Sequence, residues 1–153
     1  MRRFCSLLTR PLALTEQHES VRMFPIEGFV SNAELKGGLS MLVKNYCQVT
    51  PEPFKEAPGV TVRWMISERD GAPNFAMRVF EVEPGAASPF HTHPWEHEVF
   101  ILAGEGHVRG EGGEMPFREG DAVFVAPEER HQFVNDGGTT LRFICVVPLQ
   151  RGQ

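Results

Sequence analysis

The chain has 153 residues, of which 41% are hydrophobic and 23% charged, and its formal net charge is -5. This composition is that of an ordinary globular protein, and the length fits one domain with or without a tail. The acidic balance argues against nucleic-acid binding, and no apolar run approaches the ~20 residues of a membrane-spanning helix.

The first 40 residues differ in pattern from the rest of the chain. They show neither a helical period nor strand alternation, and Pro11, Pro25 and the pair Gly37-Gly38 interrupt them. We do not expect the arginines and apolar residues at the start to form a secretion signal, because Arg10 and Pro11 end the apolar run early. We predict a poorly structured N-terminal arm over 1–40 and a β domain over 41–153.

Two interpretations of the arm remain open. Lys36-Gly37-Gly38 stands shortly before Met41, and these residue types can be encoded by a purine-rich stretch that resembles a ribosome-binding site. Residues 1–40 would then lie upstream of the true start. Alternatively, they form a genuine arm that packs on a partner subunit. The intact mass of the native protein distinguishes the two.

From Met41 onward, short segments rich in Val, Ile, Phe and Thr alternate with turn sequences rich in Gly, Pro, Asn and Asp. We expect strands over 41–47, 60–66, 74–83, 97–103, 121–126 and 140–148, with a further strand opening at His131. Short strands with such punctuation favour an all-β sandwich or barrel. The runs AGEG (103–106) and GEGG (110–113) are interpreted as hairpin turns.

Three histidines fall close together in the segment HTHPWEHE (91–98). Alternate side chains of an extended segment share a face, so His91 and His93 point the same way. His97 opens the next strand, on the face opposite to Glu98, and His131 opens another. Because histidine is a leading ligand of Zn, Cu, Fe and Ni, the cluster is a candidate metal site. A hydrophilic surface loop is the alternative that the cluster by itself leaves open.

The segment from Gly85 to Gly104 resembles the first motif of the cupin superfamily. That motif places HxH after a glycine and a five-residue spacer, then a glutamate, then a closing glycine, and here His97 occupies the glutamate position. Reading Glu98 as that glutamate leaves only five residues before Gly104.

A second stretch, from Gly120 through His131 to Asn135, is similar to the second cupin motif, although the acidic EER (128–130) replaces the usual turn glycine. The resemblance implies an all-β fold, a small antiparallel jelly-roll barrel with the site inside. It also implies His91, His93, His97 and His131 as the metal ligands, as in small single-domain cupins of a four-histidine type. Glu98 is the alternative ligand to His97, since neighbours on a strand face opposite ways.

The resemblance further implies one divalent transition-metal ion as cofactor, with Mn, Fe, Ni, Zn and Cu all possible. Four neutral imidazoles leave such an ion a net charge of about +2, which favours an anionic ligand. Arg63 and Arg78 are candidates to bind a carboxylate at the barrel mouth, and the alternative for each is an outward surface position. Trp95 and Phe133 are candidate pocket walls.

The function that follows is a metal-dependent cupin enzyme of dioxygenase, isomerase or decarboxylase type, acting on a small anionic oxygen-rich metabolite. The alternative is a non-enzymatic module that binds or senses a small ligand through its metal, because no clear general base stands beside the ligands apart from His97 and Glu98. We also expect a homodimer, with 60–66 as a candidate edge strand at the interface. The three cysteines are few and far apart, which fits a reducing cytoplasm.

Overall fold

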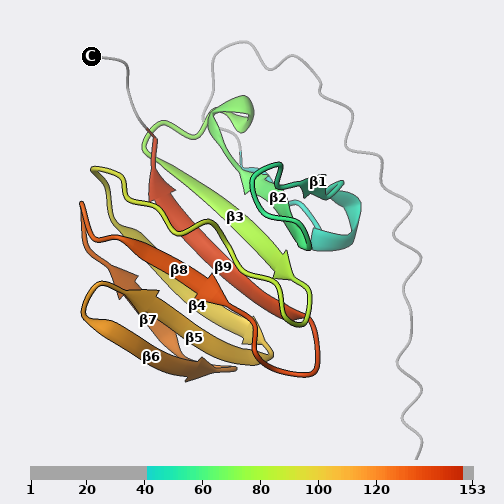
Figure 1. The fold of residues 1–153 in the computed structure, drawn as a ribbon. Helices are drawn as coiled ribbons and strands as arrows, with labels where there is room; N and C mark the ends of the chain where they lie inside the picture. Colours follow the sequence, from blue (N-terminus) through green and yellow to red (C-terminus); the bar gives the residue numbers. More distant parts are fainter. Residues whose placement is uncertain (1–40, 150–153) are drawn as a thin grey trace, which may run out of the picture. The chain divides into compact units, whose positions relative to one another are not determined.

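The computed structural model describes residues 41–149, in which nine short strands and two turns of 3-10 helix follow one another (Figure 1). The N-terminal arm predicted over 1–40 lies outside the described residues, and so does the question whether translation starts at Met41. The predicted division between 40 and 41 therefore stays a prediction. No helix in the described part is long and apolar enough to cross a membrane.

The strands form two antiparallel sheets, of six and three strands. The larger sheet runs, in spatial order, through β1 (Glu52–Pro53), β2 (Val60–Ile66), β3 (Phe75–Val82), β9 (Leu141–Pro148), β4 (His97–Ala103) and β7 (Ala122–Val125). The smaller one consists of β6 (Gly113–Arg118), β5 (Glu105–Gly110) and β8 (His131–Val134). The predicted all-β class, a small antiparallel jelly-roll barrel, is confirmed.

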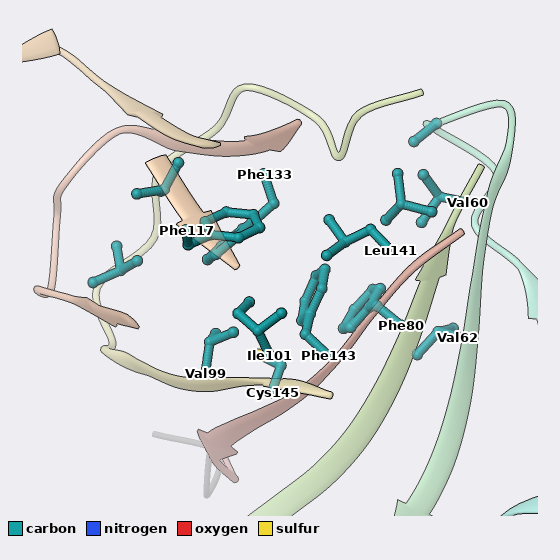
Figure 2. Close-up of a cluster of buried hydrophobic side chains, with 14 of the residues drawn as sticks. Val60, Val62, Phe80, Val99, Ile101, Phe117, Phe133, Leu141, Phe143 and Cys145 are labelled. Carbon is teal, nitrogen blue, oxygen red and sulfur yellow. The ribbon is translucent and has the colours of Figure 1, made fainter. Parts of the chain in front are cut away.

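The hydrophobic core lies between the two sheets, and both contribute side chains to it (Figure 2). Strand β4 shows the pattern that builds it: Val99 and Ile101 are buried, whereas Phe100 between them is exposed. Burying a side chain such as Ile101 fully stabilises the fold by about 1.5–3 kcal/mol. Because His97 shares the alternation of Val99 and Ile101, the packing of β4 also turns its imidazole inward.

The strand expected over 41–47 is not formed. The chain is irregular there and closes into a single 3-10 turn, η1 (Tyr46–Gln48), whose N-cap Asn45 accepts a hydrogen bond from the Cys47 backbone N–H. A side-chain cap of this kind gives the backbone an alternative to pairing in a sheet.

Contacts of Tyr46 hold the same segment against the outer face of the larger sheet. Its hydroxyl donates to the Glu81 carboxylate, and the guanidinium groups of Arg63 and Arg142 lie over its ring at 4.4 and 5.0 Å from the centroid. Cation–π contacts of this type contribute about 0.5–1 kcal/mol each at partly exposed sites.

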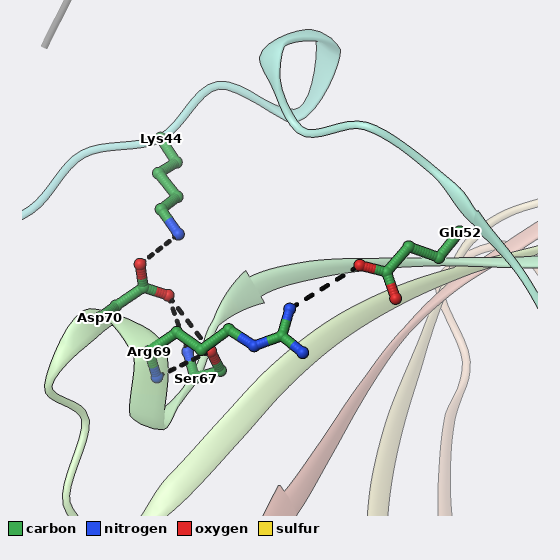
Figure 3. Close-up of polar contacts among 5 residues, drawn as sticks. All are labelled: Lys44, Glu52, Ser67, Arg69 and Asp70. Carbon is green, nitrogen blue, oxygen red and sulfur yellow. Dashed lines mark hydrogen bonds and ion pairs between the residues drawn. The ribbon is translucent and has the colours of Figure 1, made fainter.

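A second set of polar contacts joins this segment to the turn between β2 and β3 (Figure 3). In the 3-10 turn η2 (Glu68–Asp70), Ser67 and Asp70 form a reciprocal capping box, and Lys44 pairs with the Asp70 carboxylate. Arg69 reaches toward Glu52 of β1, with 3.8 Å between the charged atoms. These contacts fix the irregular segment without a ladder of backbone hydrogen bonds.

The run GEGG (110–113) forms the expected hairpin turn, because Gly110 pairs with Gly113 where β5 leads into β6. The run AGEG (103–106) does not form a hairpin turn, because Glu105 and Gly106 belong to β5, which lies in the other sheet from β4. Gly106 explains the error, because a Cβ there would lie 2.0 Å from the Val134 carbonyl oxygen. The glycine therefore allows β5 to approach β8 closely, which is a known use of glycine within strands.

Strand β2 does not form the edge of its sheet. The short β1 pairs with Thr61 and Val62, and so covers part of the edge that was expected to face a partner subunit. The homodimer itself stays a prediction.

Candidate functional site

The structure brings together the four histidines that the sequence singled out. One side-chain nitrogen from each of His91, His93, His97 and His131 lies within 4.8 Å of the others, and all but His91 are buried. Backbone pairing positions two of them: the His91 N–H donates to the His131 carbonyl oxygen at 3.1 Å, and the reverse bond measures 2.9 Å. His97 comes from the first position of β4, and His93 from the loop before it.

Two of the imidazoles are oriented by backbone carbonyls. Nδ1 of His91 lies 2.8 Å from the Pro89 oxygen, and Nδ1 of His131 lies 2.8 Å from the Glu129 oxygen. A carbonyl oxygen only accepts, so in each ring Nδ1 carries the hydrogen and the neutral form keeps its lone pair on Nε2. This is the arrangement in which metal-ligating histidines are usually held.

The other two rings face each other. Nε2 of His93 and Nε2 of His97 are 2.7 Å apart, and the His93 ring stacks on Trp95 with 4.3 Å between centroids. Nδ1 of His97 lies 3.3 Å from the Cys145 sulfur, which also accepts a hydrogen bond from Arg78 at 3.2 Å. One buried thiol therefore contacts both a histidine of the cluster and a guanidinium.

Burial sets the protonation state of the cluster. Burial is the largest cause that lowers the pKa of His97 to about 3, and the neighbouring His93 and Arg78 contribute to the same shift. Burial is also the main cause that lowers the pKa values of His93 and His131. These three imidazoles are consequently neutral at pH 7, which is the form that binds metal ions.

The donor set fits a divalent transition-metal ion. Neutral imidazole nitrogens converge within a space suited to one ion, and no carboxylate of the described residues belongs to the group. Glu98, the alternative ligand, is exposed and lies on the opposite face of β4 from His97, as alternation requires. An all-nitrogen set disfavours Mg²⁺ and Ca²⁺, which prefer oxygen.

A cavity of about 320 Å³ opens beside the four rings. Three of the four residues expected to line a pocket do so: Arg78, Trp95 and Phe133. Arg63 does not. It lies on the outer face of β2, where it pairs with Glu81 at 3.4 Å and donates to the Val49 carbonyl oxygen.

Arg78 is the only charged nitrogen-bearing side chain, apart from histidines, that lines this cavity within residues 41–149. It forms no ion pair with a described carboxylate, and its buried Nε lacks a hydrogen-bond partner there. Its guanidinium rests over Phe80 and Trp64, at 5.1 and 5.5 Å from the ring centroids. A cation held this way retains capacity for an anion.

Sequence reasoning missed other residues of the cavity, namely Phe54, Glu56, Phe80, Phe143 and Cys145. The parity of β3 could have placed Phe80 with Arg78, since the two are separated by one residue. Phe54 and Glu56 lie on an irregular loop after β1, for which the sequence carries no periodic signal.

Comparisons with known proteins agree with the fold. The family model described as a cupin domain matches residues 78–147. An oxalate-binding protein of Thermotoga maritima is 31% identical over 123 residues, covering 75% of this chain and 99% of that protein.

The chain belongs to the cupin family.

Two solved structures extend the likeness of this cupin. The polyketide cyclase RemF of Streptomyces resistomycificus superposes with a TM-score of 0.69 at 33% identity, covering 74% of this chain and 83% of that one. A predicted oxalate decarboxylase of Thermotoga maritima gives 0.63 at 29% identity, covering 71% of this chain and 100% of the other.

The depressed histidine pKa values predict that the metal-free cupin loses stability in acid. Between pH 6.5 and about 3 the unfolded state binds a proton at His97 that the folded state excludes, so the free energy of unfolding falls as the pH falls. The loss from His97 is on the order of 4 kcal/mol. Urea unfolding of chelator-treated protein at several pH values measures it. The variant His97→Gln should flatten the profile, and an equally steep profile in this variant would contradict the assignment.

Proposed function

We propose that this cupin binds one divalent transition-metal ion through His91, His93, His97 and His131 and holds a small anionic, oxygen-rich metabolite beside it. The observation that carries the proposal is the presence of Arg78, a guanidinium without an acidic partner among the described residues, in the same cavity as the four imidazoles. When bound, the ion supplies Lewis acidity, and a redox-active ion also supplies electron transfer.

The local charge supports an anionic ligand. Four neutral histidines leave the positive charge of a divalent ion uncompensated, and the Arg78 guanidinium adds to it. A carboxylate placed between the ion and Arg78 would satisfy both, because a guanidinium presents parallel N–H groups that match carboxylate oxygens. The names of two relatives, an oxalate-binding protein and a predicted oxalate decarboxylase, make oxalate the first ligand to test.

We propose further that the protein is an enzyme, of dioxygenase, isomerase or decarboxylase type. Glu56 is the one carboxylate among the described residues that lines the cavity, and it lies exposed on the loop after β1. An exposed carboxylate that lines the cavity can give or take a proton at a ligand held between Arg78 and the histidines. The alternative remains a metal-anchored binding or sensing module, which needs no such group.

The first prediction concerns the ligand set. His97→Ala should lower the affinity for the metal by at least about tenfold, whereas Glu98→Ala on the same strand should leave it within about twofold. Titration of chelator-treated protein with Zn²⁺, followed by calorimetry, measures both. If Glu98→Ala lowered the affinity for Zn²⁺ and His97→Ala did not, Glu98 would be the metal ligand in place of His97.

The second prediction concerns Arg78. Arg78→Leu should weaken oxalate binding to the Zn²⁺-loaded protein by at least about tenfold, because truncating one partner of a hydrogen-bonded charge pair costs about 2–5 kcal/mol. Arg63→Leu is the matched control, since Arg63 lies on the outer face. If both variants lost oxalate affinity equally, or neither lost any, Arg78 would not be part of the anion site.

The third prediction separates enzyme from binding module. The metal-loaded protein should convert at least one of a panel of small hydroxy acids, oxo acids and sugar acids, measured as O2 uptake, CO2 release or isomer formation. Glu56→Gln should slow that conversion about hundredfold and leave oxalate affinity unchanged. Binding of panel members without conversion would support the binding module.

A further inference from the structure

The cavity beside the histidines is larger than a small dianion needs. Its volume of about 320 Å³ would hold about ten groups of the size of a water molecule, at about 30 Å³ each. Oxalate has only six non-hydrogen atoms, which would occupy little more than about half of that space even if each atom took the volume of one water molecule. Aromatic side chains form the largest group among those that line the remaining part.

The aromatic side chains of the cavity lie close together. The rings of Phe80 and Phe143 stack with centroids 5.3 Å apart, and Phe133 stacks on Phe143 at 5.0 Å (Figure 2). All three rings line the cavity. Phe54 continues this row of rings, 6.0 Å from Phe80, and Trp95 lines the cavity near His93.

Arg78, Cys145 and the four histidines of the cavity lie together in one group. The other polar side chains that line it are Ser88, Thr92 and the exposed Glu56. Water held against the aromatic row would find no hydrogen-bond partner on those rings. Ligand pockets of this composition bind molecules whose apolar part fills the hydrophobic wall, while a few polar groups fix the orientation.

We infer that the ligand is an aryl-substituted oxo or hydroxy acid. Its carboxylate and adjacent oxygen lie toward Arg78 and the histidines, and its ring packs against Phe54, Phe80 and Phe143. Ring pairs of this kind prefer offset or edge-to-face contacts, which a row of phenylalanines offers. The inference rests on the proposed function, because it uses the same anion site, and it adds the chemical class of the ligand.

The test compares two acids that share one head group. Glyoxylate and phenylglyoxylate both carry an oxo group beside the carboxylate, and only the second has a ring. Calorimetry with the full-length Zn²⁺-loaded protein should give phenylglyoxylate an affinity at least about tenfold higher, from the apolar area that its ring buries.

A variant at the rim of the row tests the location of the ring. Phe54→Ala should weaken phenylglyoxylate about threefold to tenfold and leave glyoxylate unchanged. Phe54 is chosen because it is only partly buried, so its removal spares the core. Phe100→Ala, which removes an exposed ring from the outer face of β4, is the control and should change neither affinity.

The outcomes separate this inference from the proposed function. Glyoxylate binding as tightly as phenylglyoxylate, or Phe54→Ala weakening both alike, would overturn the aryl ligand and leave the anion site standing. Failure of glyoxylate, oxalate and phenylglyoxylate alike to bind would overturn both.

Discussion

The antiparallel pairing of His91 with His131 is the constraint on which the site depends. Their two reciprocal backbone hydrogen bonds join segments that are far apart in the sequence and bring the ring centroids to 4.7 Å. The third histidine then follows from β4, where alternation with Val99 and Ile101 turns His97 into the barrel. Two carbonyl oxygens and one thiol hold the outer nitrogens of three rings. The convergence of the imidazoles is thus a property of backbone and core.

The polarity of the cavity differs from that of the whole chain. The protein carries a net charge of -5, yet its barrel interior places Arg78 beside four histidines. Burial keeps the described imidazoles at His93, His97 and His131 neutral, so they do not repel a cation as protonated rings would. An ion bound there would add its positive charge to that of Arg78. Because the barrel interior has a lower dielectric constant than water, both charges would attract an anion more strongly than they would at the surface. The proposed preference for an anionic ligand therefore follows in part from His97, which stands where the cupin motif carries a glutamate.

Much of the fold could be predicted from the sequence, because apolar alternation and glycine punctuation report directly on half-buried strands. The spacing of the histidines also allowed the four members of the cluster to be named from the sequence. Arg78 and Arg63 could be separated only by parity: Arg78 shares the face of Phe80 and Val82, whereas Arg63 alternates with Val62 and Trp64. Strand β5 gave a turn-like signal, because its Gly106 is required by a close approach to Val134 that only the tertiary structure shows. Glu56 lies on an irregular loop, and its place beside the cavity follows from loop geometry that has no sequence period.

The proposed metal site consists of four imidazoles around one ion in the barrel. Anomalous X-ray diffraction from crystals of the protein purified from its native host, recorded across the absorption edges of Mn, Fe, Ni, Cu and Zn, is the decisive measurement. We expect a single peak within bonding distance of one nitrogen from each of His91, His93, His97 and His131. Crystals of the native protein without such a peak, or a peak bound by Glu98 in place of His97, would rule out this ligand set.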